Sequence, residues 1–336
     1  MEAFAGFAVF VVALLAFLAT GIPVAVATGL IGIVGTYLFV SPYAVSQIAI
    51  VSFSTTSYFI LTVVPLFILM GEALAITGIG RDLFRAAQLW LHRIPGSLAV
   101  GTIFACTGFS AVCGSSPVTA ATIGAMAVPE MVRHGYDRRL ALGVTAAGGT
   151  LGILIPPSIA MILYGVITET SIGDLFIAGI LPGILIAALL SLTVLLLVIA
   201  RPQIAPQLRQ TTSWPERLRA LRAVIPVLVL SFLVLGSIYF GVATPTEAGA
   251  VGAAGALAIA ALSKKLNSNV IRTILGNTVR TTAMFLLLLI GGLFSAFMLT
   301  RLGIPQGMAN ALISLNLPPW LIVIPINVLL MFLGMF

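Results

Sequence analysis

Two short stretches of the chain combine glycine, serine, threonine and proline in a way that suits the binding of small ions. Their candidate residues are Gly114, Ser115, Ser116 and Thr119 in the first stretch, and Gly149, Thr150, Gly152, Pro156, Pro157 and Ser158 in the second. Where such residues interrupt a helix, its C-terminus exposes carbonyl oxygens that suit a cation. The following N-terminus exposes N–H groups that suit an anion. The two stretches therefore predict a cation site beside a site for a carboxylate.

The ligands available in these stretches are carbonyl and hydroxyl oxygens, which predict Na⁺ as the cation. The ion is expected near Cys113, Ser115, Ser116 and Gly149. The two histidines and two cysteines of the chain have no CxxC or HExxH spacing, so no transition-metal site is expected. No cofactor is expected besides Na⁺ as a coupling ion. The N–H groups near Ser116 and near Pro157 are expected to face a substrate carboxylate.

The first stretch lies in the middle of the uncharged run 94–129, and basic residues flank both ends of that run. Each of its two arms has about 16 residues and spans about 24 Å as a helix, less than the roughly 30 Å hydrocarbon core. The run predicts a re-entrant hairpin whose tip lies inside the membrane. Ser116 is expected to cap the second arm, with Pro117 at its first helical position. An ordinary turn at the outer surface is the alternative.

The second stretch lies inside the uncharged run 140–168. Three glycines (Gly148, Gly149 and Gly152) and two prolines predict a helix that breaks in mid-membrane and resumes near Pro157. Backbone groups freed at that depth need protein or a water-lined cavity around them. Secondary transporters build their ion and substrate sites in this way. A simple proline kink is the alternative.

The composition places both stretches in a membrane protein. Of the 336 residues, 60% are apolar and 7% are charged, against roughly 25% charged residues in soluble domains, and the mean hydropathy is +1.20. A soluble protein, a disordered chain and a nucleic-acid binder are therefore excluded. The chain has neither a Walker A sequence nor a G-x-S-x-G elbow, so we expect no enzyme. An intramembrane hydrolase is a remote alternative.

Charge-free runs predict the membrane spans of an all-α polytopic protein with one membrane domain over residues 1–336. Besides the hairpin and the broken helix, spans are expected near 4–19, 22–40, 59–78, 175–200, 223–246, 248–263 and 281–300, and within 302–336. Lys and Arg cluster in residues 81–93, 133–139, 201–222 and 264–280, and are missing from the connections 41–58, 166–174 and 242–247. The positive-inside rule then puts the basic clusters in the cytoplasm and the N-terminus outside.

Two of the basic segments are expected to lie on the membrane surface. Residues 81–93 have apolar side chains at helical spacing and predict an interfacial helix, with a simple extension of span 59–78 as the alternative. Residues 201–222 are expected to form a cytoplasmic linker that lies on the lipid headgroups, with a regulatory or partner-docking role as the alternative.

The acidic residues near the membrane fall into two groups. Glu247 and Asp174 have the spacing of helix starts. Glu72 lies inside or near the end of span 59–78, where a carboxylate is a functional candidate by default. Glu72 is expected either to carry a proton or to form a structural ion pair with Arg81 or Arg85.

The chain repeats itself weakly at an offset of about 223 residues. Pro23 matches Pro245, Gly78 matches Gly303, and Pro95 matches Pro318. Because the first unit starts outside and the second starts inside, the pattern predicts an inverted-topology repeat. The first repeat covers 1–200, of which 94–200 form the transport part, and the second covers 223–336. In this register the second repeat ends within its own hairpin, so we expect an incomplete second repeat and a complete protein of about 430 residues.

The residues described above resemble the large membrane subunit of the tripartite ATP-independent periplasmic (TRAP) transporters over essentially the whole chain. The most specific matches are Val64–Gly71, Cys113–Ser116 with Thr119–Gly124, and Gly149–Ser158. The resemblance implies Na⁺-driven uptake of organic acids such as C4-dicarboxylates or sialic acid across a bacterial inner membrane. It also implies two partners, a small four-helix membrane subunit and a periplasmic substrate-binding protein.

The resemblance further implies an elevator mechanism, in which 94–200 move against a scaffold that includes 22–40 and 223–262. Cys113 and Pro117 stand where other members often have different small residues, so a backbone role of the tip is expected and the side-chain roles stay open. A stand-alone ion-coupled carboxylate transporter or antiporter of the same architecture is the main alternative. A purely structural membrane subunit would not need both breaks.

Overall fold

Every regular element is a helix in the part of the chain that the computed structural model describes, residues 2–207, 212–314 and 318–333. The first half contains α1 (Glu2–Ala19), α2 (Val24–Gly35), η1 (Thr36–Val40), η2 (Pro42–Ser46), α3 (Gln47–Thr56), η3 (Phe59–Thr62), α4 (Val63–Thr77), α5 (Ile79–Leu91), α6 (Ser97–Cys113), α7 (Ser116–Arg133), α8 (Arg138–Gly149), η4 (Thr150–Ile153) and α9 (Ile159–Thr168). The second half contains α10 (Ile172–Ala200), η5 (Pro202–Ile204), α11 (Trp214–Tyr239), α12 (Pro245–Leu262), α13 (Ser268–Arg301), α14 (Ile304–Ser314) and α15 (Pro319–Leu333).

Five of the described segments are long and apolar enough to cross a membrane, which confirms a helical multi-pass protein. They are Phe59–Thr77, Ile172–Ala200, Trp214–Tyr239, Pro245–Leu262 and Ser268–Arg301. The chain forms two compact units. Unit 1 comprises Met1–Tyr58 and Ala283–Phe336, and unit 2 comprises Phe59–Thr282. Helix α13 runs from unit 2 into unit 1.

Unit 1 is built around glycines that let α2 and α13 approach closely. A Cβ at Gly29 would lie 3.7 Å from the Cα of Gly291, and a Cβ at Gly35 would overlap the Met298 side chain. The Ser295 hydroxyl donates to the Thr28 carbonyl at 2.6 Å. The contact positions rise together along both helices, so α2 and α13 pack in parallel. Small residues at such contacts are typical of helix pairs in membranes.

Unit 2 contains a second parallel pair, α4 with α12. A Cβ at Gly249 would lie 3.3 Å from Leu66 Cβ, and a Cβ at Gly252 would lie 2.6 Å from Met70 Sδ. At the other end of the pair, the Lys265 ammonium donates to the Thr77 carbonyl. Beside these glycines, α12 buries Ala248, Ala253, Ala256 and Ala260. The absence of bulky side chains on this face of α12 lets the two backbones come close.

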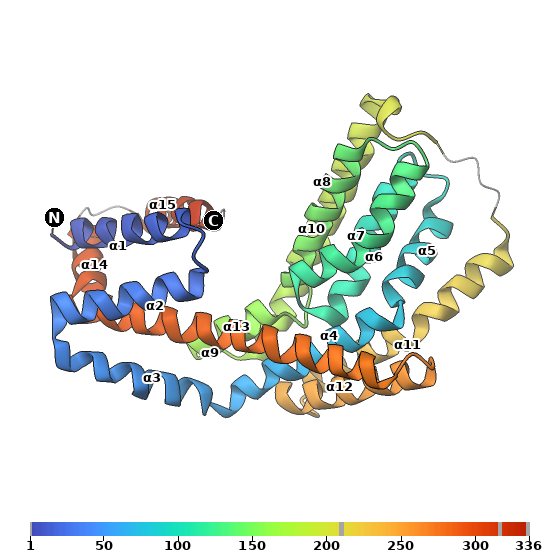
Figure 1. Ribbon diagram of the computed structural model, residues 1–336. Helices are drawn as coiled ribbons and strands as arrows, with labels where there is room; N and C mark the ends of the chain where they lie inside the picture. The colour runs from blue at the N-terminus through green and yellow to red at the C-terminus, as the bar shows by residue number, and fades with distance from the viewer. Residues whose placement is uncertain (1, 208–211, 315–317, 334–336) are drawn as a thin grey trace. The chain divides into compact units, whose positions relative to one another are not determined.

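The rest of unit 2 contains the predicted hairpin and the predicted broken helix. Helices α6 and α7 form the hairpin, α8 and α9 are the two halves of the broken helix, and α6, α7, α8 and α10 run side by side (Figure 1). Helix α4 ends at Gly78 in the left-handed conformation (φ 79°), and α5 follows as a separate helix. Residues 81–93 therefore do not extend the preceding span.

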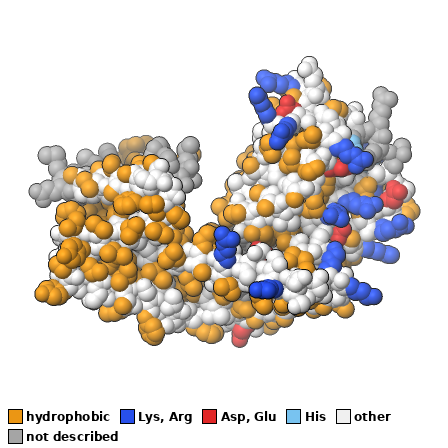
Figure 2. All heavy atoms as spheres, in the orientation of Figure 1, with side chains coloured by type: hydrophobic (Ala, Val, Ile, Leu, Met, Phe, Trp, Pro, Cys, Tyr) orange, Lys and Arg blue, Asp and Glu red, His pale blue; other side chains and the backbone are white. Residues whose placement is uncertain are grey.

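Charged side chains are much rarer in unit 1 than in unit 2. Unit 1 has two, Glu2 and Arg301, and the Arg301 guanidinium lies over the Phe297 ring at 5.2 Å. Figure 2 shows apolar side chains covering the visible face of the unit 1 helices, while most blue Lys and Arg side chains gather over unit 2. Such an apolar helical surface is typical of contact with lipid.

Three boundaries differ from the sequence-based prediction. Residues 41–58, predicted as a connection, contain α3. Helix α11 begins at Trp214, nine residues before the predicted span, because Ser213 and Glu216 form a capping box with a proline in the first turn. Helix α13 begins at Ser268, where the Asn267 side chain accepts from the Val270 N–H at 2.8 Å. The part of the predicted linker at 208–211 lies outside the described residues.

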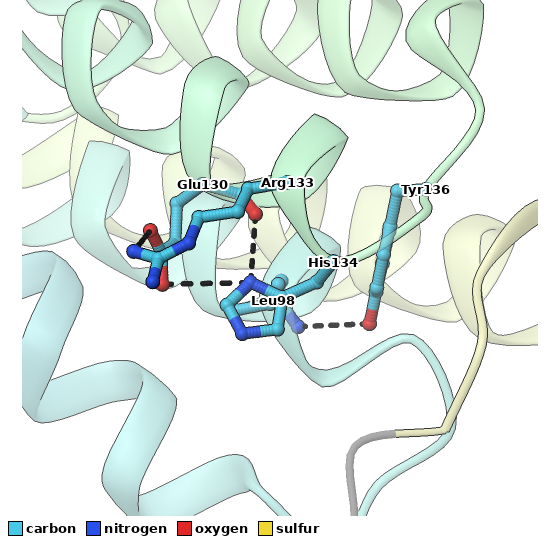
Figure 3. Close-up of polar contacts among 5 residues, drawn as sticks. All are labelled: Leu98, Glu130, Arg133, His134 and Tyr136. Carbon is cyan, nitrogen blue, oxygen red and sulfur yellow. Dashed lines mark hydrogen bonds and ion pairs between the residues drawn. The ribbon is translucent and has the colours of Figure 1, made fainter.

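The turn between α7 and α8 is fixed by polar contacts at the basic end of the hairpin. The Leu98 N–H donates to the Tyr136 hydroxyl at 3.4 Å, and the His134 ring contacts the Glu130 backbone carbonyl at 2.9 Å and its carboxylate at 3.5 Å (Figure 3). The Asp137 N–H donates to the Ile204 carbonyl at 2.8 Å. Burial raises the pKa of the Tyr136 hydroxyl above its ordinary value, and the hydrogen bonds to Leu98 and Ser97 partly oppose that rise.

Candidate functional site

The tip of the hairpin is a two-residue turn between helices. Gly114 has φ 64° and its N–H donates to the Ser110 carbonyl at 3.2 Å, which ends α6. Ser115 is extended and is the N-cap of α7, which begins at Ser116. The prediction that Ser116 caps the second arm is wrong by one residue, because Ser116 and Pro117 are already helical, and Ser115 makes no side-chain cap bond. Among the described residues, no N-cap side chain therefore accepts from the first N–H groups of α7.

The broken helix has the predicted interruption. Helix α8 ends at Gly149, the single 3₁₀ turn η4 covers Thr150–Ile153, and α9 begins at Ile159. Ser158 closes the break, because its hydroxyl donates to the Ile153 carbonyl at 2.7 Å and accepts from the Met161 N–H at 3.4 Å. The simple proline kink is thereby excluded, and the second half starts two residues after Pro157.

The hairpin tip lies directly against the break. The Ile159 N–H donates to the Gly114 carbonyl at 3.2 Å. A Cβ at Gly114 would lie 2.6 Å from the Pro157 carbonyl oxygen, and a Cβ at Gly152 would lie 2.6 Å from the Ser115 carbonyl oxygen. Cβ atoms do not approach other atoms this closely, so both positions require glycine. The two stretches that stood out in the sequence thus form one site made mostly of backbone.

A second pair of glycine contacts extends this site along the hairpin. A Cβ at Gly149 would lie 2.6 Å from Ala120 Cβ, and on α4 a Cβ at Gly71 would lie 3.1 Å from the Cys113 carbonyl oxygen. The end of α8 therefore touches α7, and the end of α6 touches α4. Gly71 was part of the motif Val64–Gly71 but was not predicted as a site residue.

The hydroxyl groups near the tip differ in their surroundings. Thr119 and Ser110 are fully buried, and their hydroxyls have no hydrogen-bond partner among the described residues. Ser115 is buried as well, and Ser116 is partly exposed. Thr150 is exposed, and its hydroxyl donates to the Ala147 carbonyl at 2.7 Å. Buried hydroxyls without partners are costly, so Thr119 and Ser110 mark the tip as a place where a ligand can supply the missing contact.

Ser110 is a candidate that the sequence-based reasoning missed. It lies one helical turn before Cys113, so its position in an uncharged arm close to the tip was the available signal. Pro156, Pro157 and Ser158 are buried behind the tip contact and shape the break. In the described parts of the chain, no three His, Cys, Asp or Glu side chains come together as a metal-binding group.

Glu72 does not form the ion pair that the sequence suggested as one alternative. Its carboxylate accepts from the Asn277 side-chain amide at 2.9 Å, and no Lys, Arg or His lies within 4.0 Å of it in the described parts of the chain. Arg81 and Arg85 follow the break at Gly78 and belong to α5, which separates them from the α4 carboxylate. The ion-pair hypothesis is therefore wrong, and the proton-carrier hypothesis stays a prediction.

Comparison with known proteins gives consistent results. Residues 11–336 match the family described as "Tripartite ATP-independent periplasmic transporter, DctM component". The C4-dicarboxylate TRAP transporter large permease protein DctM of Pseudomonas aeruginosa is 37% identical over 302 residues, 90% of this chain and 70% of the relative. The sialic acid TRAP transporter large permease protein SiaM of Vibrio cholerae is 33% identical over 279 residues, 83% of this chain and 65% of the relative.

A third relative has a different substrate in its name. The ectoine TRAP transporter large permease protein TeaC of Halomonas elongata is 34% identical over 253 residues, which are 75% of this chain and 58% of the relative. The three names share the function of a large permease and differ in the compound transported.

Proposed function

The chain belongs to the DctM family of TRAP transporter large permeases, and we propose that it carries an organic acid across the bacterial inner membrane together with Na⁺. The relatives are transport permeases, so the chain is a multi-pass transport protein and not an enzyme. The observation that carries the proposal is the contact between the hairpin tip and the broken helix, where two pairs of helix ends meet in an uncharged part of the chain.

The proposed Na⁺ ligands are the carbonyls at the ends of α6 and α8 with the hydroxyls of Ser115 and Ser116. Each helix C-terminus carries about half a negative charge, so two of them nearly balance one monovalent cation. The buried hydroxyls of Ser110 and Thr119 lie within a turn or so of the tip and add oxygen atoms to its surroundings. The segments 94–129 and 140–168 contain no charged residue, so no charged side chain competes with the ion inside the hairpin or the break.

The proposed substrate group is a carboxylate bound at the N-termini of α7 and α9. The α7 N-terminus has no side-chain cap bond, which leaves its N–H groups available to an anion. The names of the relatives include a C4-dicarboxylate, sialic acid and ectoine, all of which carry a carboxylate. A site made of backbone N–H groups accepts that shared group while leaving the choice of compound to another component.

An inverted repeat is part of the proposal, and the glycine contacts support it. Gly252 of α12 contacts Met70 of α4. With the offset of 222 residues that separates Pro23 from Pro245, the counterpart of Gly252 is Leu30 and the counterpart of Met70 is Gly292. These two positions adjoin the observed contact of Gly29 with Gly291. The α4–α12 pair of unit 2 thus has a counterpart in the α2–α13 pair of unit 1.

The direction of the helices supports the inversion. Consecutive membrane spans run in opposite directions. The second span of one repeat can therefore be parallel to the third span of the other only if the two repeats have opposite orientations in the membrane. The helices α2 and α13 pack in parallel, and so do α4 and α12.

We further propose that the hairpin and the broken helix move as one body in an elevator mechanism. The proposed partners are a small four-helix membrane subunit and a periplasmic binding protein, with the N-terminus in the periplasm.

The proposal is tested by transport in proteoliposomes that contain the protein with both partners. We expect uptake of a radiolabelled dicarboxylate or sialic acid that requires an inward Na⁺ gradient and the loaded binding protein. Ser115→Ala and Ser116→Ala are expected to raise the Na⁺ concentration for half-maximal uptake. Uptake at full rate with K⁺ in place of Na⁺ would contradict the proposed coupling, and uptake of free substrate without the binding protein would favour a stand-alone transporter.

A further inference from the structure

Glu72 is a carboxylate with no Lys, Arg or His side chain within 4.0 Å of it among the described residues. It lies in the candidate span Phe59–Thr77, and in the described residues its one hydrogen bond comes from the neutral amide of Asn277. That bond engages Oε2, and Oε1 accepts no hydrogen bond from the residues that the structure describes. Ionisable groups inside a membrane are costly and are usually paired. A bound ligand is therefore the expected partner of the Glu72 carboxylate.

The surroundings of Glu72 are also negative. Its neighbour Gly71 faces the last residue of α6, where the Cys113 carbonyl oxygen lies 3.1 Å from the position of a Cβ at Gly71. Cys113 ends α6, so the negative end of that helix dipole lies beside the carboxylate. Two negative groups at one place repel each other unless a cation lies between them.

A small cavity joins these groups. Its volume is about 10 Å³, and the residues that line it include Glu72, Cys113, Ser115 and Thr281. Space of about this size holds a single water molecule, and a dehydrated monovalent cation is no larger. Carboxylate, hydroxyl and carbonyl oxygens are ligands for hard cations such as Na⁺, and one carboxylate balances a single positive charge.

We propose that Glu72 and Thr281, together with the hairpin tip, form a second Na⁺ site on the α4 and α13 side of the tip. This site shares tip residues with the proposed site at the broken helix and differs from it in Glu72 and Thr281, and it rests on the proposed function only for the identity of the ion. A cation there joins the tip to α4 and to the first half of α13.

Binding of ²²Na⁺ to the purified chain in nanodiscs tests the site without any need for transport. We expect Glu72→Gln, which keeps the shape and removes the charge, to abolish one bound Na⁺ per chain or to weaken its affinity at least tenfold. Thr281→Val, which removes the hydroxyl, is expected to weaken binding several-fold, whereas Thr281→Ser retains it. Glu169→Gln changes a carboxylate of the exposed loop after α9 and is the matched control, with unchanged binding.

Three outcomes distinguish the Glu72 site from the main site, which is the proposed Na⁺ site between the hairpin tip and the broken helix. Unchanged Na⁺ stoichiometry and affinity in both Glu72→Gln and Thr281→Val, with monodisperse and helical protein, would overturn it. Gly149→Val disturbs the break and should leave the Glu72-dependent ion in place. Loss of all Na⁺ in Gly149→Val, with no effect of Glu72→Gln, would keep the main site and reject this one. Loss in Glu72→Gln alone would keep this site and reject the main one.

Discussion

The Ile159 N–H donates a hydrogen bond of 3.2 Å to the carbonyl of Gly114. This bond joins the first turn of α9 to the tip of the hairpin, and so connects two breaks that are 45 residues apart in the chain. At membrane depth a backbone group without a partner costs several kcal/mol. The two interruptions therefore stabilise each other, because each supplies a backbone group that the other needs. A change at either one is expected to affect both.

Gly152→Ala tests this mutual packing. The new Cβ would lie 2.6 Å from the Ser115 carbonyl oxygen and 2.9 Å from the Ser116 nitrogen, both backbone atoms that cannot move aside alone. We expect a loss of stability of about 1–3 kcal/mol, as for other overpacked sites, together with loss of Na⁺-dependent uptake. Thermal unfolding in detergent and uptake in proteoliposomes measure the two effects.

Gly143→Ala is the matched control for that substitution. It lies in α8, six residues before Gly149, and a Cβ there meets nothing within 4 Å. The change is expected to be neutral or to stabilise by up to about 1 kcal/mol through helix propensity. Equal effects of the two substitutions would show that the tip contact does not constrain Gly152.

Accessibility of single cysteines tests the topology. Cysteines at Arg138 and Ser213 should react with a membrane-impermeant maleimide only after the membrane is opened, and a cysteine at Thr170 should react in intact cells. Cys106 and Cys113 are buried, so the native background is expected to be low. Reaction of the Ser213 position from outside would reverse the orientation and remove the argument for inversion.

A disulfide between Gly249→Cys and Leu66→Cys tests the parallel packing of α4 and α12. The two Cβ positions are 3.3 Å apart, close to the separation of about 3.8 Å in disulfides. Mild oxidation should give a fast, complete cross-link, seen as a mobility shift after cleavage between the helices. Gly249→Cys with Ile76→Cys is the control, because ten residues further along α4 correspond to about 15 Å. Cross-linking of the control pair instead would indicate the opposite helix direction.

Tyr136→Phe is expected to alter the response of stability to alkaline pH. Burial holds the pKa of Tyr136 above its ordinary value, so the proton leaves the unfolded chain at lower pH than the folded one. The stabilisation is fully present below about pH 10, where the unfolded tyrosine titrates, and is lost as pH rises toward the folded-state pKa. At pH 8 the variant should be less stable by about 1 kcal/mol, for the lost hydrogen bond to Leu98.

Comparing the natural protein with Tyr136→Phe at higher pH gives a further expected result. Between pH 8 and pH 10.5 the stability of the natural protein should fall more steeply than that of Tyr136→Phe, so the difference between them should shrink. Melting curves of both proteins in one detergent measure it, and shared effects of other tyrosines and lysines cancel in the difference. A constant difference over this range would show that Tyr136 does not titrate differently in the folded protein.

The sequence by itself determined the features that depend on local chemistry. Charge-free runs located most of the long apolar helices, and glycine and proline located both breaks to within two residues, because the left-handed conformation at Gly114 and the stop at the proline pair follow from the residues themselves. The capping box at Glu247 was predicted for the same reason, and its bonds to Thr244 are 2.8 Å and 3.3 Å. The repeat offset of about 223 residues could be found from the sequence because similar residues recur at that spacing within one chain.

Only the tertiary structure decided which distant groups meet. Nothing near Glu72 in the chain indicates that its carboxylate accepts from Asn277, which lies on α13, or that its expected partners Arg81 and Arg85 turn away after Gly78. The contact of Gly152 with the backbone of Ser115 likewise joins two stretches that are far apart in the sequence. Such contacts arise from close packing of segments far apart in sequence, and that packing is a property of the folded chain rather than of any short stretch of residues.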